Sequence, residues 1–208
     1  CFQRKKYFCS FDSKKSKNTI FLVGNSIMAS IQEELRINLD NRDIKFIPMT
    51  RSAGNELEAN KNRRNKILKN KNATIIFHFD SSLDYKELIN FKETIIFFLD
   101  KSYKVILLYP IPKFNENTSE VLAEKIQQKN FDYEYNYLNI LYKEYQNETK
   151  FIFSELNKIN HKNLFKRYPH KIFCNTETLN KCISHNKKDI FFIDESHLSK
   201  KGSELINI

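Results

Sequence analysis

The sequence has few residues that break or loosen a fold, and it has no long hydrophobic run. Only 4 Pro and 3 Gly occur among 208 residues, while 40% of the chain is hydrophobic. Disordered chains have the opposite composition, so we expect one ordered domain over residues 1–208. No apolar run reaches the roughly 20 residues of a membrane-spanning helix, since even Glu93–Asp100 is bounded by acids. We therefore expect no membrane span within these residues.

Cysteine is also scarce, with four residues in two local groups: Cys1 with Cys9, and Cys174 with Cys182. Neither group has C-x-x-C spacing and no His set lies at zinc-like intervals, so we predict no metal site. A bridge between Cys174 and Cys182 would stabilise the fold by about 2–3 kcal/mol. Two disulfides would indicate the periplasm or the cell exterior, whereas reduced buried thiols remain the alternative.

The net charge of +10 is compatible with an anionic partner such as nucleic acid, an acidic glycan or a membrane surface. Lys and Asn are nevertheless spread along the whole chain, and the short cluster Lys61–Lys66 falls where a helix presents a solvated face. No zinc-finger spacing, RNP motif or stripe of aromatic and basic residues accompanies the charge. We therefore predict no nucleic-acid partner. The chain begins at Cys1 without a methionine or signal peptide, so we expect it to be part of a longer protein.

Short apolar runs alternate with amphipathic segments in the first half of the chain. The apolar runs predict strands, and the segments between them predict helices. The expected strands are Asn18–Val23, Ile44–Met49, Ala73–Phe79 and Tyr103–Tyr109, and the expected helices are Ser26–Leu39, Asn55–Lys69 and Asp84–Leu99. Such alternation, with strands apolar on both faces, indicates a parallel sheet covered by helices in an α/β fold.

The second half of the chain has a less regular pattern. We expect a helix over Ser119–Gln146, irregular structure over Phe151–Asn186, a last sheet strand over Asp189–Ile193 and a terminal helix from about Ser199.

Ser26 is the first candidate for chemistry, because Gly24-Asn25-Ser26 follows a predicted buried strand and opens a helix. Ligands of open α/β sheets bind beyond the carboxyl ends of strands. A serine in the first turn can also direct its own N–H toward an oxyanion. Serine is equally a common helix cap, so both interpretations stay open. The motif is not a G-x-S-x-G elbow, because Met28 stands at the second glycine position.

Asp194 and His197 form the second candidate, directly after the last predicted strand. A carboxylate and an imidazole three residues apart can share one turn, so Asp194 can hold one ring nitrogen while the other faces a nucleophile. A solvated loop is the alternative. The two candidates support each other because both would lie at strand ends of one sheet.

These residues together resemble the SGNH (GDSL-type) hydrolases. The similarity is strongest to the SGNH domain fused behind the membrane acyltransferase-3 domain of bacterial polysaccharide O-acetyltransferases. Phe21–Ser26 resembles the strand-GDS block of that branch, and Val105–Pro112 resembles its central strand ending in prolines. Cys174 with Cys182 is similar to its cysteine pair, and Phe192–Ser199 with Gly202 is similar to its D-x-x-H-L-S block.

The resemblance implies a three-layer α/β/α flavodoxin-like fold with a mainly parallel sheet. It implies a Ser26, His197 and Asp194 triad that needs no cofactor, with the N–H groups of Ser26 and Gly54 as the oxyanion hole. The chain departs from the family where Asn25 replaces an Asp. It also lacks the Asn of the third block, where His78 stands near the strand end as a possible donor.

The function that the resemblance implies is O-acetyl transfer through a serine ester to a bacterial surface polysaccharide. The acyl donor would come from a membrane acyltransferase-3 domain of the same or a partner chain, and the domain would lie in the periplasm, tethered to the inner membrane. Two alternatives stay open: a secreted carbohydrate esterase with the same triad, and a noncatalytic module that binds glycan. Asn25 and the missing third-block Asn favour the noncatalytic alternative.

Overall fold

The computed structural model describes residues 18–40, 42–50, 56–82, 84–127 and 138–206. The chain forms two compact units. Of the described residues, unit 1 takes those within Cys1–Phe79, Leu83–Leu108 and Ile159–Arg167, and unit 2 takes those within Asp80–Ser82, Tyr109–Lys158 and Tyr168–Ile208. Cys1, Cys9 and Gly54 lie outside the described residues.

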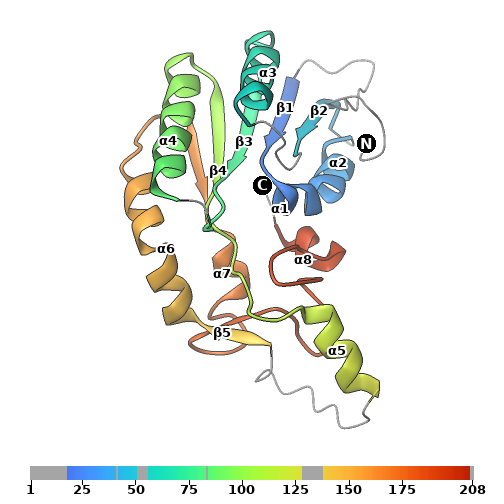
Figure 1. Cartoon of the computed structure of the whole chain (residues 1–208). Coiled ribbons are helices and arrows are strands. Elements are labelled where there is room, and N and C mark those ends of the chain that lie inside the picture. The colour runs from blue at the N-terminus through green and yellow to red at the C-terminus, as the bar shows by residue number, and fades with distance from the viewer. Residues whose placement is uncertain (1–17, 41, 51–55, 83, 128–137, 207–208) are drawn as a thin grey trace. The chain divides into compact units, whose positions relative to one another are not determined.

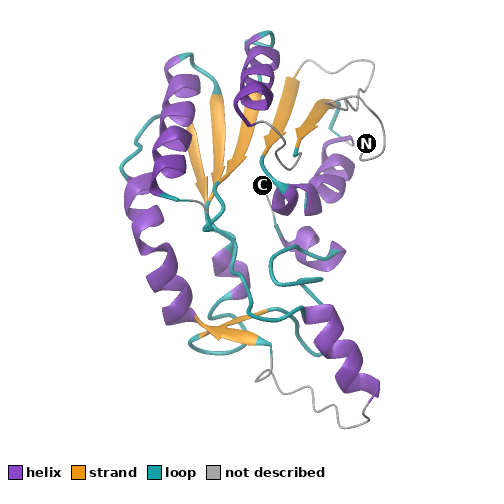
Figure 2. Ribbon diagram, in the orientation of Figure 1, coloured by secondary structure: helices purple, strands orange, loops and turns teal. Residues whose placement is uncertain are grey.

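Unit 1 is built on a parallel sheet, in which the described residues form five strands with the order β2-β1-β3-β4-β6 (Figures 1 and 2). The strands are β1 (Asn18–Val23), β2 (Ile44–Met49), β3 (Thr74–His78), β4 (Lys104–Leu108) and β6 (Leu164–Arg167). This is the flavodoxin-like strand order, in which the chain reverses direction across the sheet between β1 and β3. The predicted α/β fold with a parallel sheet is therefore confirmed.

The helices of unit 1 are the crossovers between its parallel strands: α1 (Ser26–Ser30), α2 (Gln32–Asp40), α3 (Glu56–Leu68) and α4 (Tyr85–Asp100). Right-handed crossovers put α1 and α2 on one face of the sheet and α3 and α4 on the other, because the strand order changes direction after β2. Figure 1 shows α3 and α4 on the same side of the strands, and the Arg64 guanidinium lies 3.4 Å from the centre of the Phe97 ring, which joins the two helices.

The core of unit 1 between β3 and α4 is aromatic. Phe77 contacts Phe91 and Phe98 at ring-centre distances of 5.9 and 6.0 Å, and Phe98 contacts Tyr103 at 5.4 Å. A capping box between Asp84 and Glu87 starts α4, because each side chain accepts the other residue's backbone N–H. Local capping and aromatic burial together fix the helix against the strand.

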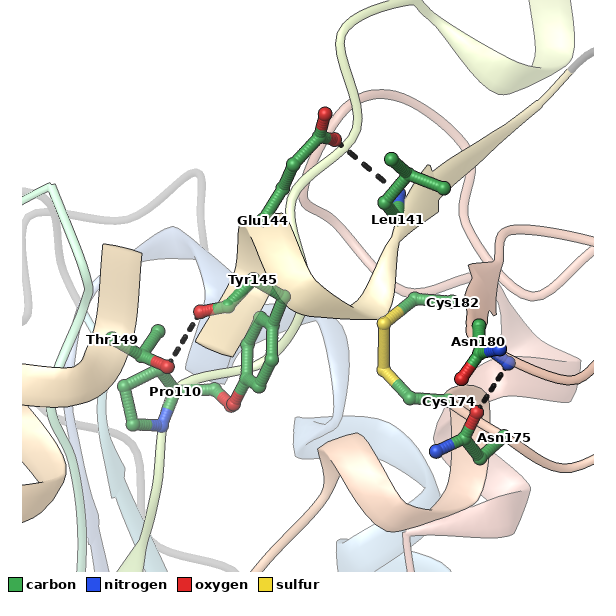
Figure 3. Close-up of a disulfide and its surroundings, with 9 residues drawn as sticks. All are labelled: Pro110, Leu141, Glu144, Tyr145, Thr149, Cys174, Asn175, Asn180 and Cys182. Atoms are coloured by element: carbon green, nitrogen blue, oxygen red, sulfur yellow. Dashed lines mark hydrogen bonds between the residues drawn. A yellow bond between two sulfur atoms is a disulfide. The ribbon is translucent and has the colours of Figure 1, made fainter. Parts of the chain in front are cut away.

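Unit 2 holds shorter elements: α5 (Thr118–Gln127), β5 (Asn139–Leu141), α6 (Tyr142–Asn157), α7 (His170–Phe173), β7 (Lys181–Ile183) and α8 (Lys200–Leu205). β5 and β7 pair antiparallel, with Ile140 opposite Cys182. A disulfide joins Cys174, just after α7, to Cys182 in β7, as Figure 3 shows. The predicted Cys174–Cys182 bridge is therefore present.

An aromatic cluster lies between α6 and α7. His170 is buried among the rings of Tyr142, Tyr145, Phe153 and Tyr168, at ring-centre distances of 5.3–6.2 Å. The Tyr145 hydroxyl donates to the Pro110 carbonyl at 2.7 Å. The Thr149 hydroxyl donates to the Tyr145 carbonyl, as the dashed line in Figure 3 shows. The bond to Pro110 ties α6 to the chain that leaves β4, and the bond from Thr149 lies within α6.

Two helix predictions need correction. The helix expected over Ser26–Leu39 is divided at Ile31 into α1 and α2, because the Ser30 hydroxyl donates back to the Ile27 carbonyl at 2.6 Å and competes with the helix ladder. The prediction of one continuous helix over Ser119–Gln146 was also wrong. The described part of this range contains α5, then β5, and then the start of α6.

The predicted last sheet strand, Asp189–Ile193, was also wrong. This segment makes only isolated bridges, such as Phe192 with Leu198, and none of the described sheet strands includes it. Its two phenylalanines, Phe191 and Phe192, are buried by aromatic packing instead, since Phe192 contacts Phe114 and Phe173 at 4.8 and 5.0 Å, whereas Ile190 and Ile193 are exposed. The fifth sheet strand is β6, within a segment that we expected to be irregular.

Candidate functional site

The Ser26 segment begins with a glycine that the packing requires. Gly24 follows β1, and a Cβ at this position would lie 2.3 Å from Cγ of Met28. Met28 is fully buried, so its side chain has little room to withdraw. The close approach lets the chain turn tightly from the strand into α1.

Asn25 is the N-cap of α1. Its Oδ1 accepts the Ile27 N–H at 3.1 Å, and its carbonyl accepts the Ala29 N–H at 3.1 Å. An amide oxygen can make the capping bond that a carboxylate would make, so replacing the family's Asp preserves the turn. Ser26 is thereby held as the first residue of the helix, followed by the buried side chains of Ile27 and Met28.

Ser26 lies at the topological switch point of the sheet. β1 pairs with β2 on one side and β3 on the other, and crossovers leave β1 and β3 in opposite directions. Ligands of doubly wound proteins bind in the crevice at this point. His78 is the last residue of β3, one position beyond the pair of Val23 with Phe77, and its side chain is buried. The fold therefore gives the Ser26 turn the location that a catalytic nucleophile needs.

Asp194 and His197 form a compact hydrogen-bonded turn in unit 2. Oδ1 of Asp194 accepts the backbone N–H groups of Ser196 at 2.8 Å and His197 at 2.7 Å. Oδ2 of Asp194 lies 2.6 Å from Nδ1 of His197. One carboxylate thus organises the turn and orients the imidazole that the turn carries.

The hydrogen bonds also set the ionisation of Asp194. Partial burial acts to raise its pKa, but the His197 and Ser196 N–H groups and the imidazole outweigh that effect and leave the pKa below its ordinary value. The Asp194 side chain is therefore a carboxylate at neutral pH. An ionised carboxylate beside Nδ1 favours the tautomer with its proton on Nδ1.

Residues before and at the start of α5 support this turn, although the sequence analysis did not identify them. The Phe114 N–H donates to the Glu195 carbonyl at 2.8 Å, and the Ser119 N–H donates to the Ile193 carbonyl at 3.2 Å. Asn117 caps the helix by accepting the Glu120 N–H. The cap residue and acid three positions later signal the helix start, but contacts 74 to 81 residues away leave no mark in local sequence.

The sequence analysis also missed the ion pair between Asp80 and Lys113 in unit 2. Asp80 accepts hydrogen bonds from both the N–H and the hydroxyl of Ser82, and its carboxylate pairs with the Lys113 ammonium at 2.5 Å. Burial acts to raise the pKa of Asp80, but Lys113 and Ser82 overcome this effect and lower it to about 2. The pair joins the segment after β3 to the segment after β4.

The structure brings together some of the predicted site residues. It pairs Asp194 with His197, and Cys174 with Cys182. Ser26, Asn25 and His78 belong to unit 1, whereas Asp194 and His197 belong to unit 2.

No cluster of metal-ligating side chains occurs among the described residues. Within the same residues, none of the helices has the length and apolarity needed to cross a bilayer.

The doubly wound sheet, the serine at its switch point and the Asp-x-x-His turn together define the class of SGNH-type α/β proteins. The chain belongs to the family of SGNH domains fused to AT3 domains, whose family model matches residues 1–207. The match extends over both units. A comparison with curated proteins found no match. The chain is thus an acyltransferase-associated SGNH module.

Proposed function

We propose that this chain is an O-acyltransferase domain that moves an acyl group, in the simplest case acetyl, to a hydroxyl of a bacterial surface polysaccharide. The Asp194–His197 turn is the observation that carries the proposal, because it holds an imidazole ready to act as a general base. The association of the family with AT3 domains supports acyl transfer as the chemistry.

The proposed reaction has two steps through an ester on Ser26. In the first step Oγ of Ser26 attacks the acyl carbonyl, and Nε2 of His197 takes the hydroxyl proton and gives it to the departing donor group. In the second step an acceptor hydroxyl attacks the ester, and His197 takes its proton and returns it to Ser26. The acyl group moves from donor to acceptor, and the enzyme is regenerated.

This reaction requires Oγ of Ser26 and Nε2 of His197 to come within about 3 Å of each other in the working protein. Asp194 keeps the proton of the imidazole on Nδ1 in the resting state. It then stabilises the imidazolium that forms when His197 accepts the serine proton.

Negative charge that develops on the acyl oxygen needs hydrogen-bond donors. We assign this role to the N–H groups of Ser26 and Gly54, with Asn25 and His78 as possible further contacts. The cap formed by Asn25 supports this assignment for Ser26, because it fixes the backbone of the first helical turn. Each donor of this kind contributes roughly a hundredfold or more to the rate.

The proposed partners are the polysaccharide acceptor and an AT3 domain, of the same or another chain, that supplies the acyl group. The proposed location is the periplasm, with a tether to the inner membrane outside these residues. The Cys174–Cys182 disulfide supports this location, because structural disulfides persist in oxidising compartments.

The central test is Ser26→Ala, with Ser30→Ala as a matched control in the same helix. Because Ser26 carries the ester, its loss should lower acyl transfer from an activated aryl acetate by about three to six orders of magnitude. Ser30→Ala removes the hydroxyl that bonds to the Ile27 carbonyl, and it should leave the rate within about threefold. Retained transfer in Ser26→Ala with an intact fold would refute the assignment.

Covalent labelling separates the proposed transferase from the two alternatives. A fluorophosphonate should label Ser26 in the unaltered chain and much more slowly in His197→Ala. Unlabelled protein that binds glycan equally well with and without Ser26 would favour the noncatalytic module. Labelled protein that releases only free acetate when acceptor glycan is present would favour the esterase.

A further inference from the structure

Positive charge is concentrated at the amino ends of the strands in unit 1, which form the edge of the sheet opposite Ser26. The chain enters three adjacent strands, β3, β4 and β6, at this edge through loops that we take with their flanking residues as 69–73, 100–104 and 159–163. These loops contain five lysines and a single acid, Asp100; the lysines, all exposed, are Lys69, Lys71, Lys101, Lys104 and Lys162. We call these five residues the lysine edge.

Hydrogen bonds and strand pairing show that the lysine edge is continuous. Thr74 pairs with Lys104 across β3 and β4, and the Val105 N–H donates to the Asn163 carbonyl at 2.9 Å. The Asn163 side chain donates to the Ser102 carbonyl at 3.3 Å, which connects the loops before β4 and β6. Since neighbouring strands lie about 4.8 Å apart, the lysines gather within a short width of the sheet.

Helix capping explains only part of this concentration. Lys69 and Lys101 follow the ends of α3 and α4, where a cation interacts favourably with the helix dipole. Lys71, Lys104 and Lys162 have no such position: the first and last lie in loops, and Lys104 begins β4. By contrast, the described loops at the carboxyl ends of β1, β3 and β4 contain one lysine, Lys113, and it is paired with Asp80.

The chemistry of the lysine edge favours an anionic surface over a nucleic acid. Its three loops contain no Arg, and their aromatic residue, Tyr103, is buried. Single-stranded nucleic acids are commonly bound by exposed aromatic rings that stack on the bases and by Arg side chains. Lysines act as mobile point charges, which suit a field of anionic headgroups.

We propose that the lysine edge docks unit 1 on an anionic phospholipid bilayer. Docking by this edge directs the carboxyl ends of the strands, where Ser26 lies, away from the lipid. Five residues of β3 separate the two edges by about 17 Å. The serine then faces the aqueous side, from which a polysaccharide acceptor would approach.

Vesicle sedimentation with the full 208-residue chain tests the proposal. Vesicles of phosphatidylcholine with a quarter of phosphatidylglycerol should bind the chain, and pure phosphatidylcholine vesicles should not. Each lysine at such a surface strengthens binding about fivefold, so Lys71, Lys104 and Lys162 changed together to Gln should weaken it roughly a hundredfold. Added salt should release the chain, because it screens exposed charges.

The matched control changes Lys143, Lys150 and Lys187 of unit 2 to Gln, which removes the same charge from equally exposed positions. Circular dichroism checks that both triple variants are folded. Equal loss in both variants would show a response to net charge alone and would overturn the proposal. Failure to bind the anionic vesicles, or preferential binding of RNA or a soluble acidic polysaccharide in competition, would also overturn it.

Discussion

The Asp194→Asn variant should remove the hydrogen bond that orients His197 and keep the backbone of the turn unchanged. The amide oxygen can still accept the N–H groups of Ser196 and His197, so the backbone should keep its conformation. The other carboxylate oxygen is replaced by an NH₂ donor, which faces Nδ1 at a separation of 2.6 Å in the unaltered protein. Two donors cannot bond to each other, so the ring proton should move to Nε2. An Nε2 that carries a proton cannot accept one from Ser26.

The expected kinetic loss is about four orders of magnitude in the acylation rate at neutral pH, the size expected when a triad imidazole is held in the wrong tautomer. The stability loss should be about 1 kcal/mol or less, because the carboxylate and imidazole are each more than a quarter exposed and solvent can replace the bond. Stopped-flow acylation and urea unfolding measure the two effects. The downfield Nδ1 proton of His197 in NMR spectra reports the tautomer directly.

The acid dependence of stability gives a second measurement on the same variant. The pKa of Asp194 is lower in the folded protein than in the unfolded chain. Its stabilising contribution is therefore present above the ordinary carboxyl pKa of about 4 and is lost as the pH falls through the lower folded value. The Asn variant should lack this part of the acid loss. Asp189→Asn removes the same charge from a nearby loop position and is the control. Wild-type acylation in Asp194→Asn would refute the proposed role of the dyad.

Three further predictions concern the scaffold of unit 2. Gly202→Ala should lower the free energy of unfolding by about 1–3 kcal/mol in urea titrations and slow acylation, because the new Cβ would lie 2.1 Å from the Phe191 carbonyl oxygen. Lys201→Ala is the exposed control. A Gly202→Ala protein with unchanged stability would contradict the packing argument. Burial, with a smaller effect of Lys171, lowers the pKa of His170 to about 4. The free energy of unfolding should therefore fall by about 3 kcal/mol as the pH decreases from about 6.5 to about 4. His170→Phe should remove this acid loss, and persistence of the loss would exclude His170 as its source. Replacing Cys174 and Cys182 together by Ser should cost about 2–3 kcal/mol in the same titrations, since the bridge closes a loop of sequence separation 8, and equal stability of the variant and the oxidised chain would show that the bridge contributes nothing.

The first four sheet strands could be predicted because their signal is local. β1 and β2 begin and end at the predicted residues, and β3 and β4 lie one residue inside the predicted bounds. β1, β3 and β4 are central parallel strands, buried on both faces, so their sequences are largely apolar, and β2 lies at an edge but still has four buried residues, Phe46–Met49. β6 was missed because none of its residues is buried and Lys166 and Arg167 break the apolar run.

The incorrect strand at Asp189–Ile193 has the complementary explanation. Its apolar run is buried in part, since Phe191 and Phe192 are core residues. Burial can be provided by a sheet or by aromatic side chains from distant segments, and the sequence pattern is the same in both cases. Phe114 and Phe173 provide it here.

The sequence by itself determined the features whose partners lie within a few residues. The Asp194–His197 pair spans three positions and closes in one turn, and the Asn25 cap reaches only to Ile27. Tertiary structure decided the contacts that fix this turn, because Phe114 and Ser119 reach it from more than 70 residues away. It also decided the lysine edge, since only a parallel sheet gathers residues from three separate loops at one end of its strands. Local interactions need only a turn of the few residues between the partners. Distant interactions depend on the strand order, which brings separate segments of the chain together.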